Sequence, residues 1–337
     1  MSMDGDAGKD ATQRGDADEL RAQQIDYFAR CFAHLSEHVG AVVLGASRAI
    51  ELALTCLFSE GHLLLEDLPG VGKTTLARVI SASIDARHDR VQFTPDLLPS
   101  DVTGFSVFHP GTQEFEFREG PVFANIVIAD EINRASPKVQ SALLEVMEER
   151  RVTVDGATHP VPRPFMIVAT QNPIELEGTY RLPEAQLDRF LIRTSMGQPS
   201  LEAEVAMVLA QGVVASETAP SGLRSDHIEA LIAIAAAVRV REPVVEYAAS
   251  ICRATRTGPN VRMGASPRAT LALVRAARVR AAADRRDFVS PDDIRSLTRP
   301  VLAHRIELHA SASVHKITQD DIIDEAVRSI APPQDRG

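Results

Sequence analysis

A short apolar run that breaks into a glycine-containing turn and then a helix constrains the fold of this chain more than any other feature. The run covers His62 to Glu66, and the turn after it contains Gly70 and Gly72. Apolar residues then recur on one helical face, at Leu76, Val79, Ile80 and Ile84. A strand buried on both faces, followed by a tight turn and a helix, is the repeating unit of a parallel sheet flanked by helices.

The turn itself has the residues of a phosphate-binding loop. In such a loop, backbone N–H groups and a helix amino terminus converge on phosphate oxygens, while lysine adds charge and a hydroxyl binds Mg²⁺. Asp67 stands where the usual pattern begins with glycine, and a ligand-free strand-to-helix turn is the alternative interpretation. The residues that we expect to bind phosphate are Pro69, Gly70, Val71, Gly72, Lys73, Thr74 and Thr75.

A second buried strand is expected at residues 125–129, and it ends in two adjacent acids, Asp130 and Glu131. Asp130 suits the ligand shell of Mg²⁺ together with Thr74, and Glu131 can accept a hydrogen bond from an attacking water. Two adjacent acids also occur in solvated turns. The phosphate loop upstream and a further buried strand downstream favour the catalytic interpretation.

That further strand, at residues 165–169, leads into Thr170, Gln171, Asn172 and Pro173. Ligands of open α/β sheets bind at the carboxyl ends of the strands. We therefore expect Asn172 to hydrogen-bond the γ-phosphate or the attacking water. Alone, the same residues would indicate an ordinary Asn-Pro turn.

The chain divides by pattern into four segments. Residues 1–19 are acidic, rich in Gly and Ala and without apolar periodicity, which predicts disorder. An α/β nucleotide-binding domain is expected over 20–199, beginning with two helices, the second of them over about 47–58. No strand is expected after Pro199, so 200–331 is predicted to be an all-helical domain, and 332–337 a tail. The helices expected in the domain 200–331 lie near 200–212, 225–239, 244–256, 266–284 and 291–299.

Charge and composition narrow the class of protein. The net charge of −10 opposes binding to nucleic acid, although a local basic groove stays open. Cys31, Cys56 and Cys252 are too far apart for a disulfide framework or a zinc site and are expected to be buried thiols. No long uncharged apolar run or signal-peptide pattern occurs, so we expect no membrane insertion and a cytoplasmic location.

Long ordered blocks of the sequence resemble the AAA+ ATPases and, within them, the MoxR family. The blocks read LLLEDLPGVGKTTLA, IVIADEINRASPKVQSALLEVMEER, VATQNPIELEGTYRLPEAQLDRF and GASPRATLAL. The similarity extends over residues 35–330, and Asp67 in place of the first glycine is ordinary for that family. The resemblance implies an AAA+ P-loop fold, a parallel sheet sandwiched by helices with a C-terminal all-helical lid, that hydrolyses ATP with Mg²⁺.

The resemblance also assigns roles to residues. Lys73 and Thr74 belong to the phosphate loop, Asp130 and Glu131 to the second ATPase motif, and Asn172 is the first sensor. Two arginines are added that pattern alone does not single out. Arg189, in QLDRF, matches the arginine finger that a subunit inserts into its neighbour's site. Arg268, in GASPR, matches the second sensor, which reaches the γ-phosphate of its own subunit.

A ring oligomer, expected to be a hexamer, follows from the resemblance, as does a client protein that ATP hydrolysis remodels. The expected client has a von Willebrand factor A domain. Alternatives are a nucleic-acid motor, a metal-chelatase ATPase subunit and an inactive ATP-binding scaffold. Alternating residues predict hairpins at 104–120, inserted in the second helix of the α/β domain, and at 151–161. These hairpins contact a client or pack between subunits.

Overall fold

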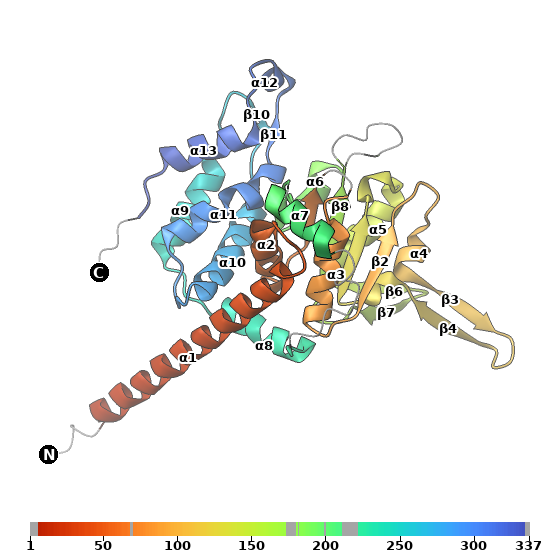
Figure 1. Ribbon diagram of the computed structural model, residues 1–337, viewed down its shortest axis with the longest axis horizontal. Helices are drawn as coiled ribbons and strands as arrows, with labels where there is room; N and C mark the ends of the chain where they lie inside the picture. Colours follow the sequence, from red (N-terminus) through yellow and green to blue (C-terminus); the bar gives the residue numbers. More distant parts are fainter. Residues whose placement is uncertain are drawn as a thin grey trace.

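The computed structural model describes residues 6–67, 70–172, 180, 182–198, 200–210 and 222–333 (Figure 1). Its centre is a five-stranded sheet in the order β2-β5-β8-β1-β9, and every neighbouring pair is parallel. The strands are β1 (Leu63–Glu66), β2 (His88–Gln92), β5 (Ile126–Asp130), β8 (Met166–Gln171) and β9 (Ile192–Thr194). The three strands expected at 62–66, 125–129 and 165–169 are thereby confirmed, and they are neighbours in the sheet.

Side chains of the sheet alternate between two apolar cores. On β1, Leu63 and Leu65 belong to the first core and Leu64 to the second, as the period of two requires. β5 and β8 alternate in the same way. The helices around the sheet are α1 (Asp6–Gly40), α2 (Ser47–Phe58), α3 (Lys73–Ser83), α4 (Pro99–Thr103), α5 (Pro137–Glu149) and α6 (Glu184–Leu187), with the 3₁₀ turns η1 (Pro121–Phe123) and η2 (Ile132–Arg134).

Helix α1 corrects the expectation of disorder for residues 6–19, part of the segment 1–19 that was expected to be disordered. The helix begins at Asp6, although residues 1–5 lie outside the described part. Its later turns are anchored by buried residues that include Phe28 and Leu35. Extending a helix costs far less than nucleating one, so the anchored turns allow a polar, Ala-containing segment to continue as helix. Figure 1 shows these first turns extending away from the rest of the molecule.

The part after β9 is mainly helical, as expected. Its helices are α7 (Leu201–Ala210), α8 (Ser225–Ala236), α9 (Glu242–Ala254), α10 (Pro267–Ala283), α11 (Pro291–Leu302), α12 (Ala310–Val314) and α13 (Gln319–Ser329), with the 3₁₀ turn η3 (Ala303–Arg305). The expectation that no strand follows Pro199 is wrong, because β10 (Val261–Met263) pairs antiparallel with β11 (Glu307–Leu308). Strands of two and three residues are too short to carry a periodic pattern.

Two hairpins project from the α/β part. The first joins β3 (Gly104–His109) to β4 (Glu114–Glu119) and lies between α4 and η1. The second joins β6 (Arg151–Val154) to β7 (Ala157–Pro160). The ring of Phe117 stacks on that of His159 with centroids 4.1 Å apart, which links the two hairpins. In Figure 1 the first hairpin lies at the end of the molecule opposite the start of α1.

His62, just before β1, is a buried histidine with both ring nitrogens satisfied. Its Nδ1 accepts the Ile167 N–H at 3.0 Å, and its Nε2 lies 3.1 Å from the Met147 carbonyl oxygen. A proton on Nε2 and none on Nδ1 therefore fits both bonds. Burial lowers the pKa of His62 to about 4, because the charged ring would lose its hydration.

We expect His62 to make folding stability depend on pH. Below about pH 6.5 His62 becomes protonated in the unfolded chain but stays neutral in the folded protein. The free energy of unfolding therefore falls by about 2–3 kcal/mol between pH 7 and pH 4.5. Urea unfolding of wild type and His62→Gln at both pH values measures this, because the amide donates and accepts without titrating. His304, whose pKa burial also lowers, is common to both proteins. An equal pH dependence in the two would contradict the assignment.

Candidate functional site

The predicted phosphate loop joins β1 to α3. Pro69, one of its seven predicted residues, lies outside the described part, whereas the other six, from Gly70 to Thr75, are described. Gly70 and Gly72 both have φ of +87°, a conformation that side-chain-bearing residues rarely adopt. Gly72 is the residue before the first turn of α3, so its conformation directs the backbone into the helix. The amino terminus of α3 is thereby presented at the carboxyl edge of the sheet, as a phosphate site requires.

The two predicted metal ligands lie side by side. Thr74 Oγ1 is 3.2 Å from Asp130 Oδ2 and 3.4 Å from Asp130 Oδ1. Asp130 is buried at the end of β5, where Thr170 Oγ1 donates to its Oδ1 at 3.2 Å. Within the described ranges, no group of three or more His, Cys, Asp or Glu side chains forms a metal cluster. One carboxylate and one hydroxyl suit Mg²⁺, which usually keeps waters and substrate phosphates as its other ligands.

The orientation of Glu131 is fixed by its backbone conformation and by two hydrogen-bond donors to its carboxylate. Its φ of +58° is left-handed, a strained conformation that clusters at functional sites, and its N–H donates to Thr170 Oγ1 at 3.0 Å. Its carboxylate accepts hydrogen bonds from Gln92 at 2.9 Å and Arg134 at 2.8 Å. The predicted base therefore points in a fixed direction at the same edge of the sheet as Asp130.

Three residues that contact Asp130 or Glu131 were not predicted from the sequence. Gln92 and Arg134 bind Glu131, and Arg90 Nε donates to Asp130 Oδ2 at 2.7 Å. The register of β2 against β5 places Gln92 opposite Asp130. Knowledge that β2 neighbours β5 would have found Arg90 and Gln92, but strand order is not readable from local pattern.

Asp67 and Asn172 complete this edge. The Asp67 carbonyl oxygen accepts a hydrogen bond from Lys73 Nζ at 2.6 Å, and its carboxylate accepts the N–H of Met196. The residue that replaces the usual glycine thus ties the phosphate loop to the segment after β9. Asn172 follows β8 and is 9% exposed. The structure brings Lys73, Thr74, Asp130, Glu131 and Asn172 to the carboxyl ends of three adjacent strands.

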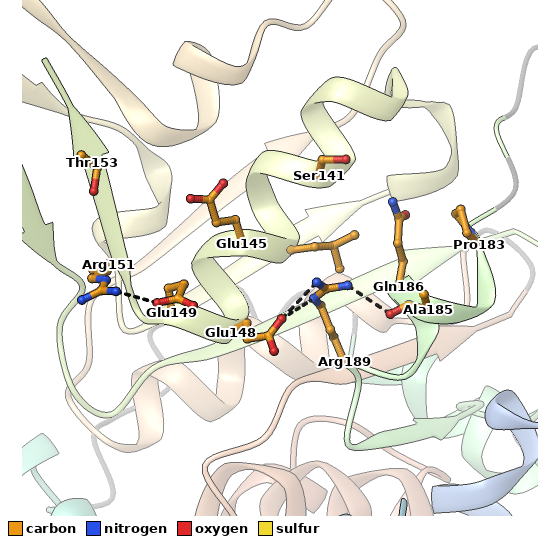
Figure 2. A pocket seen from close by; sticks show the side chains of 11 residues that line it. Ser141, Glu145, Glu148, Glu149, Arg151, Thr153, Pro183, Ala185, Gln186 and Arg189 are labelled. Carbon is orange, nitrogen blue, oxygen red and sulfur yellow. Dashed lines mark hydrogen bonds and ion pairs between the residues drawn. The ribbon is translucent and has the colours of Figure 1, made fainter. Parts of the chain in front are cut away.

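The two predicted arginines meet at a different place, on Glu148 of α5. Arg189 Nε and Nη2 lie 3.1 Å and 3.0 Å from Glu148 Oε2, as Figure 2 shows. Arg268 forms an ion pair with the other oxygen, Oε1. The hydrogen bond from Arg268, more than that from Arg189, lowers the pKa of Glu148. Both guanidinium groups therefore converge on one carboxylate.

Arg268, which the resemblance assigns to the γ-phosphate of its own subunit, pairs in this structure with Glu148 of α5. Helix α5 starts at Pro137, shortly after Glu131, and Glu148 lies about 16 Å further along its axis. Arg268 thus pairs near the far end of α5 from Glu131. The lid places Arg268 beside Arg189. The two residues are 79 positions apart in the sequence (268 minus 189), so no local motif reveals that they meet.

An open cavity of about 760 Å³ lies beside Arg189. Figure 2 shows Ser141, Glu145 and Glu148 of α5 on one side and Gln186 and Arg189 on the other. The cavity gives a group from another molecule room to approach Arg189.

Comparison with known proteins agrees with this geometry. The family model for the ATPase family associated with various cellular activities (AAA) matches residues 62–192, and the AAA lid domain matches 253–326. Chaperone MoxR1 of Mycobacterium tuberculosis is 42% identical, over 88% of this chain and 81% of its own. The protein MoxR of Methylorubrum extorquens is 31% identical, over 88% and 93%. The chain belongs to the MoxR family of AAA+ ATPases. This MoxR-family ATPase is also 46% identical to the uncharacterized protein YeaC of Bacillus subtilis, over 89% of this chain and 94% of YeaC.

A crystal structure from Cytophaga hutchinsonii superimposes on this MoxR-family ATPase with a TM-score of 0.87 and 33% identity, covering 96% of this chain and 99% of the other. The AAA match contains the phosphate loop, Asp130, Glu131, Asn172 and Arg189, and the lid match contains Arg268. The protein is therefore a nucleotide-binding, chaperone-like ATPase. None of its described helices is long and apolar enough to span a membrane.

Proposed function

We propose that this ATPase hydrolyses Mg·ATP at sites shared between neighbouring subunits of a ring, and that the cycle remodels a client protein. One observation supports the shared site. Arg189 and Arg268 converge on Glu148, near the carboxyl end of α5, and not on the Thr74–Asp130 pair of the same chain. Two guanidinium groups that meet on one carboxylate have the spacing to meet on one phosphate group. Arg189 and Arg268 therefore serve the nucleotide of the next subunit.

In the proposed site, one chain holds the nucleotide and the other supplies charge. The loop from Pro69 to Thr75 binds the phosphates, and Thr74 and Asp130 hold Mg²⁺, which neutralises developing negative charge when bound. Glu131 accepts a hydrogen bond from the attacking water, and Asn172 orients that water or the γ-phosphate. The neighbour's two arginines stabilise the charge that spreads over the transferred group.

The client is proposed to be a protein with a von Willebrand factor A domain, and the ring a hexamer. A relative named as a chaperone supports action on other proteins. The β3–β4 hairpin supports a protein contact as well, since Phe108 and Phe115 pair with ring centroids 5.2 Å apart and are 48% and 73% exposed. Exposed apolar groups on a projecting element are typical of protein-binding surfaces.

The arginines of α10 and of the turn after it disfavour the nucleic-acid alternative. Arg275 donates to the Ser59 and Glu60 carbonyl oxygens, and Arg278 donates to that of Ala236. Arg286 forms an ion pair with Asp293 at 2.6 Å. Arginines that already bond to other groups of the same chain leave little charge for a phosphate backbone, and the molecule as a whole is acidic.

The shared site predicts that turnover per subunit rises with protein concentration. Dilution separates subunits and removes the arginines from each nucleotide, whereas a site complete within one chain would show constant turnover. Steady-state hydrolysis of ATP with and without Mg²⁺, over a hundredfold range of protein concentration, measures this. Sedimentation velocity on the same samples shows whether activity follows the oligomer. Constant turnover in dissociated subunits would overturn the proposal.

A further inference from the structure

The turn after α6 is held by a buried arginine of the lid. The Arg305 side chain, in η3, is 3% exposed, and its Nε donates to Asp188 Oδ1 at 2.7 Å. Its Nη2 donates to the carbonyl oxygens of Asp188 at 3.1 Å and Phe190 at 2.7 Å. Its Nη1 donates to those of Leu191 and Val301. Every nitrogen of this guanidinium is therefore bonded, and most of its bonds reach residues 188–191.

The second oxygen of Asp188 reaches the start of α10. Ser266 Oγ donates to Asp188 Oδ2 at 3.1 Å. Ser266 is the residue before the first turn of α10, yet its side chain makes no capping bond to that helix. The hydroxyl thus serves the contact with Asp188 and not the helix end. Arg268 lies only two positions further along the same helix.

Through the carboxylate of Asp188, these contacts connect the backbone that carries Arg189 to the start of the helix that carries Arg268. Asp188 and Arg189 are consecutive, but Asp188 binds the lid while Arg189 binds Glu148 on α5. Because Asp188 also binds Ser266, the backbone that carries Arg189 is tied to the helix end that carries Arg268. Thermal motion of the lid therefore cannot easily separate the two guanidinium groups.

Stability alone does not explain an ion pair between a buried Arg305 and a partly buried Asp188. Removing two charges from water costs several kcal/mol per ion, and well-packed apolar residues are often as stable or more stable. A guanidinium fork with fixed directions holds a turn in one geometry, which an apolar contact does not do. The contacts of Arg305 and Asp188 therefore favour a role in geometry.

We propose that Asp188, Arg305 and Ser266 are positioning residues that set the spacing of Arg189 and Arg268 for one phosphate group of a neighbouring subunit. The inference rests on the proposed shared site and adds the residues that align it. In this role the three residues act on the two arginines and not on the nucleotide. Weakening the contacts therefore lowers kcat and leaves ATP affinity unchanged, because Lys73, Thr74 and Asp130 bind ATP elsewhere in the chain.

The test uses Ser266→Ala, Asp188→Asn and Arg305→Lys in the full-length ATPase. A small displacement of a catalytic group costs up to about 10²-fold in rate, so we expect kcat to fall about 10-fold in Ser266→Ala and about 10²-fold in the other two. The Kd for ATP should stay within twofold of wild type. Ser313→Ala is the matched control, because its exposed hydroxyl donates to the Ala310 carbonyl oxygen within α12.

Mixing separates positioning from general damage. Glu131→Gln subunits carry intact arginines, so mixing them with Asp188→Asn should recover turnover at the Asp188→Asn nucleotide sites. A loss of ATP affinity, or a loss of turnover that mixing does not recover, would contradict the positioning role. If Asp188→Asn or Arg305→Lys fails to fold, Ser266→Ala decides the question, because no capping bond is lost.

The two proposals fail in different ways. If Arg189→Ala retains wild-type turnover, the shared site is wrong. If Arg189→Ala is inactive while Ser266→Ala and Arg305→Lys match Ser313→Ala, the shared site stands and only the positioning role is wrong.

Discussion

Arg189→Ala is expected to bind ATP with wild-type affinity and to hydrolyse it about 10³–10⁵ times more slowly, the range for an arginine supplied to a neighbouring site. Binding survives because the phosphate loop and Asp130 lie in the other partner of each shared site. Arg151→Ala is the matched control, since Arg151 lines the same cavity and pairs with Glu149 at 2.8 Å (Figure 2). Equilibrium ATP binding and single-turnover hydrolysis on both variants make the comparison.

Mixing tests whether Arg189 acts between subunits. A Glu131→Gln subunit presents Arg189 but cannot hydrolyse its own ATP, and an Arg189→Ala subunit has the opposite defect. Mixed rings contain pairs in which an intact Glu131 meets an intact Arg189. Turnover of the mixture should exceed the sum of the two variants alone. A mixture that stays inactive, although the subunits exchange, would contradict a shared site.

Glu131→Gln is the second variant with a large expected effect, a decrease in hydrolysis of about 10²–10⁴-fold with ATP binding retained. The amide keeps the shape of the side chain and an oxygen for the Gln92 and Arg134 donors. It loses the negative charge that draws a proton from water. Quench-flow measurement of one turnover separates this chemical step from product release.

Glu149→Gln is the control for that substitution, because Glu149 is an acid of α5 that pairs with Arg151. Wild-type turnover in Glu131→Gln would remove Glu131 from its role. The variant also stays in its ATP-bound state, so it can retain a client. Recovery of a protein with a von Willebrand factor A domain, dependent on Mg·ATP, would support the proposed client.

Local sequence predicted the elements whose signals are contiguous. The strand β1 and the helix α3 lie where they are expected, and α2 has the predicted bounds of Ser47–Phe58. Hydrophobic periodicity and a helix amino terminus are encoded within a few residues, so single-sequence reasoning suffices for them. The carboxyl edge of the sheet then follows, because parallel strands end together.

Contacts between residues far apart in the sequence could not be predicted from local patterns. Asp188 and Arg305 are 117 positions apart, and Glu148 and Arg268 are 120 apart. No local pattern records that η3 packs against the turn after α6. The family resemblance supplied Arg268 but not its pairing with Glu148, because the position of the lid relative to α5 decides which side chains Arg268 meets.

The shared apolar core has a mechanical consequence. Leu63 and Leu65 of the sheet belong to one continuous cluster with α1–α3 and with lid residues such as Leu273 and Leu297. Bending the lid away from the sheet would expose that cluster to water, at a cost that grows with every buried side chain. In the proposed ring, we therefore expect each subunit to move as a whole body during the ATP cycle, with the bending points between chains.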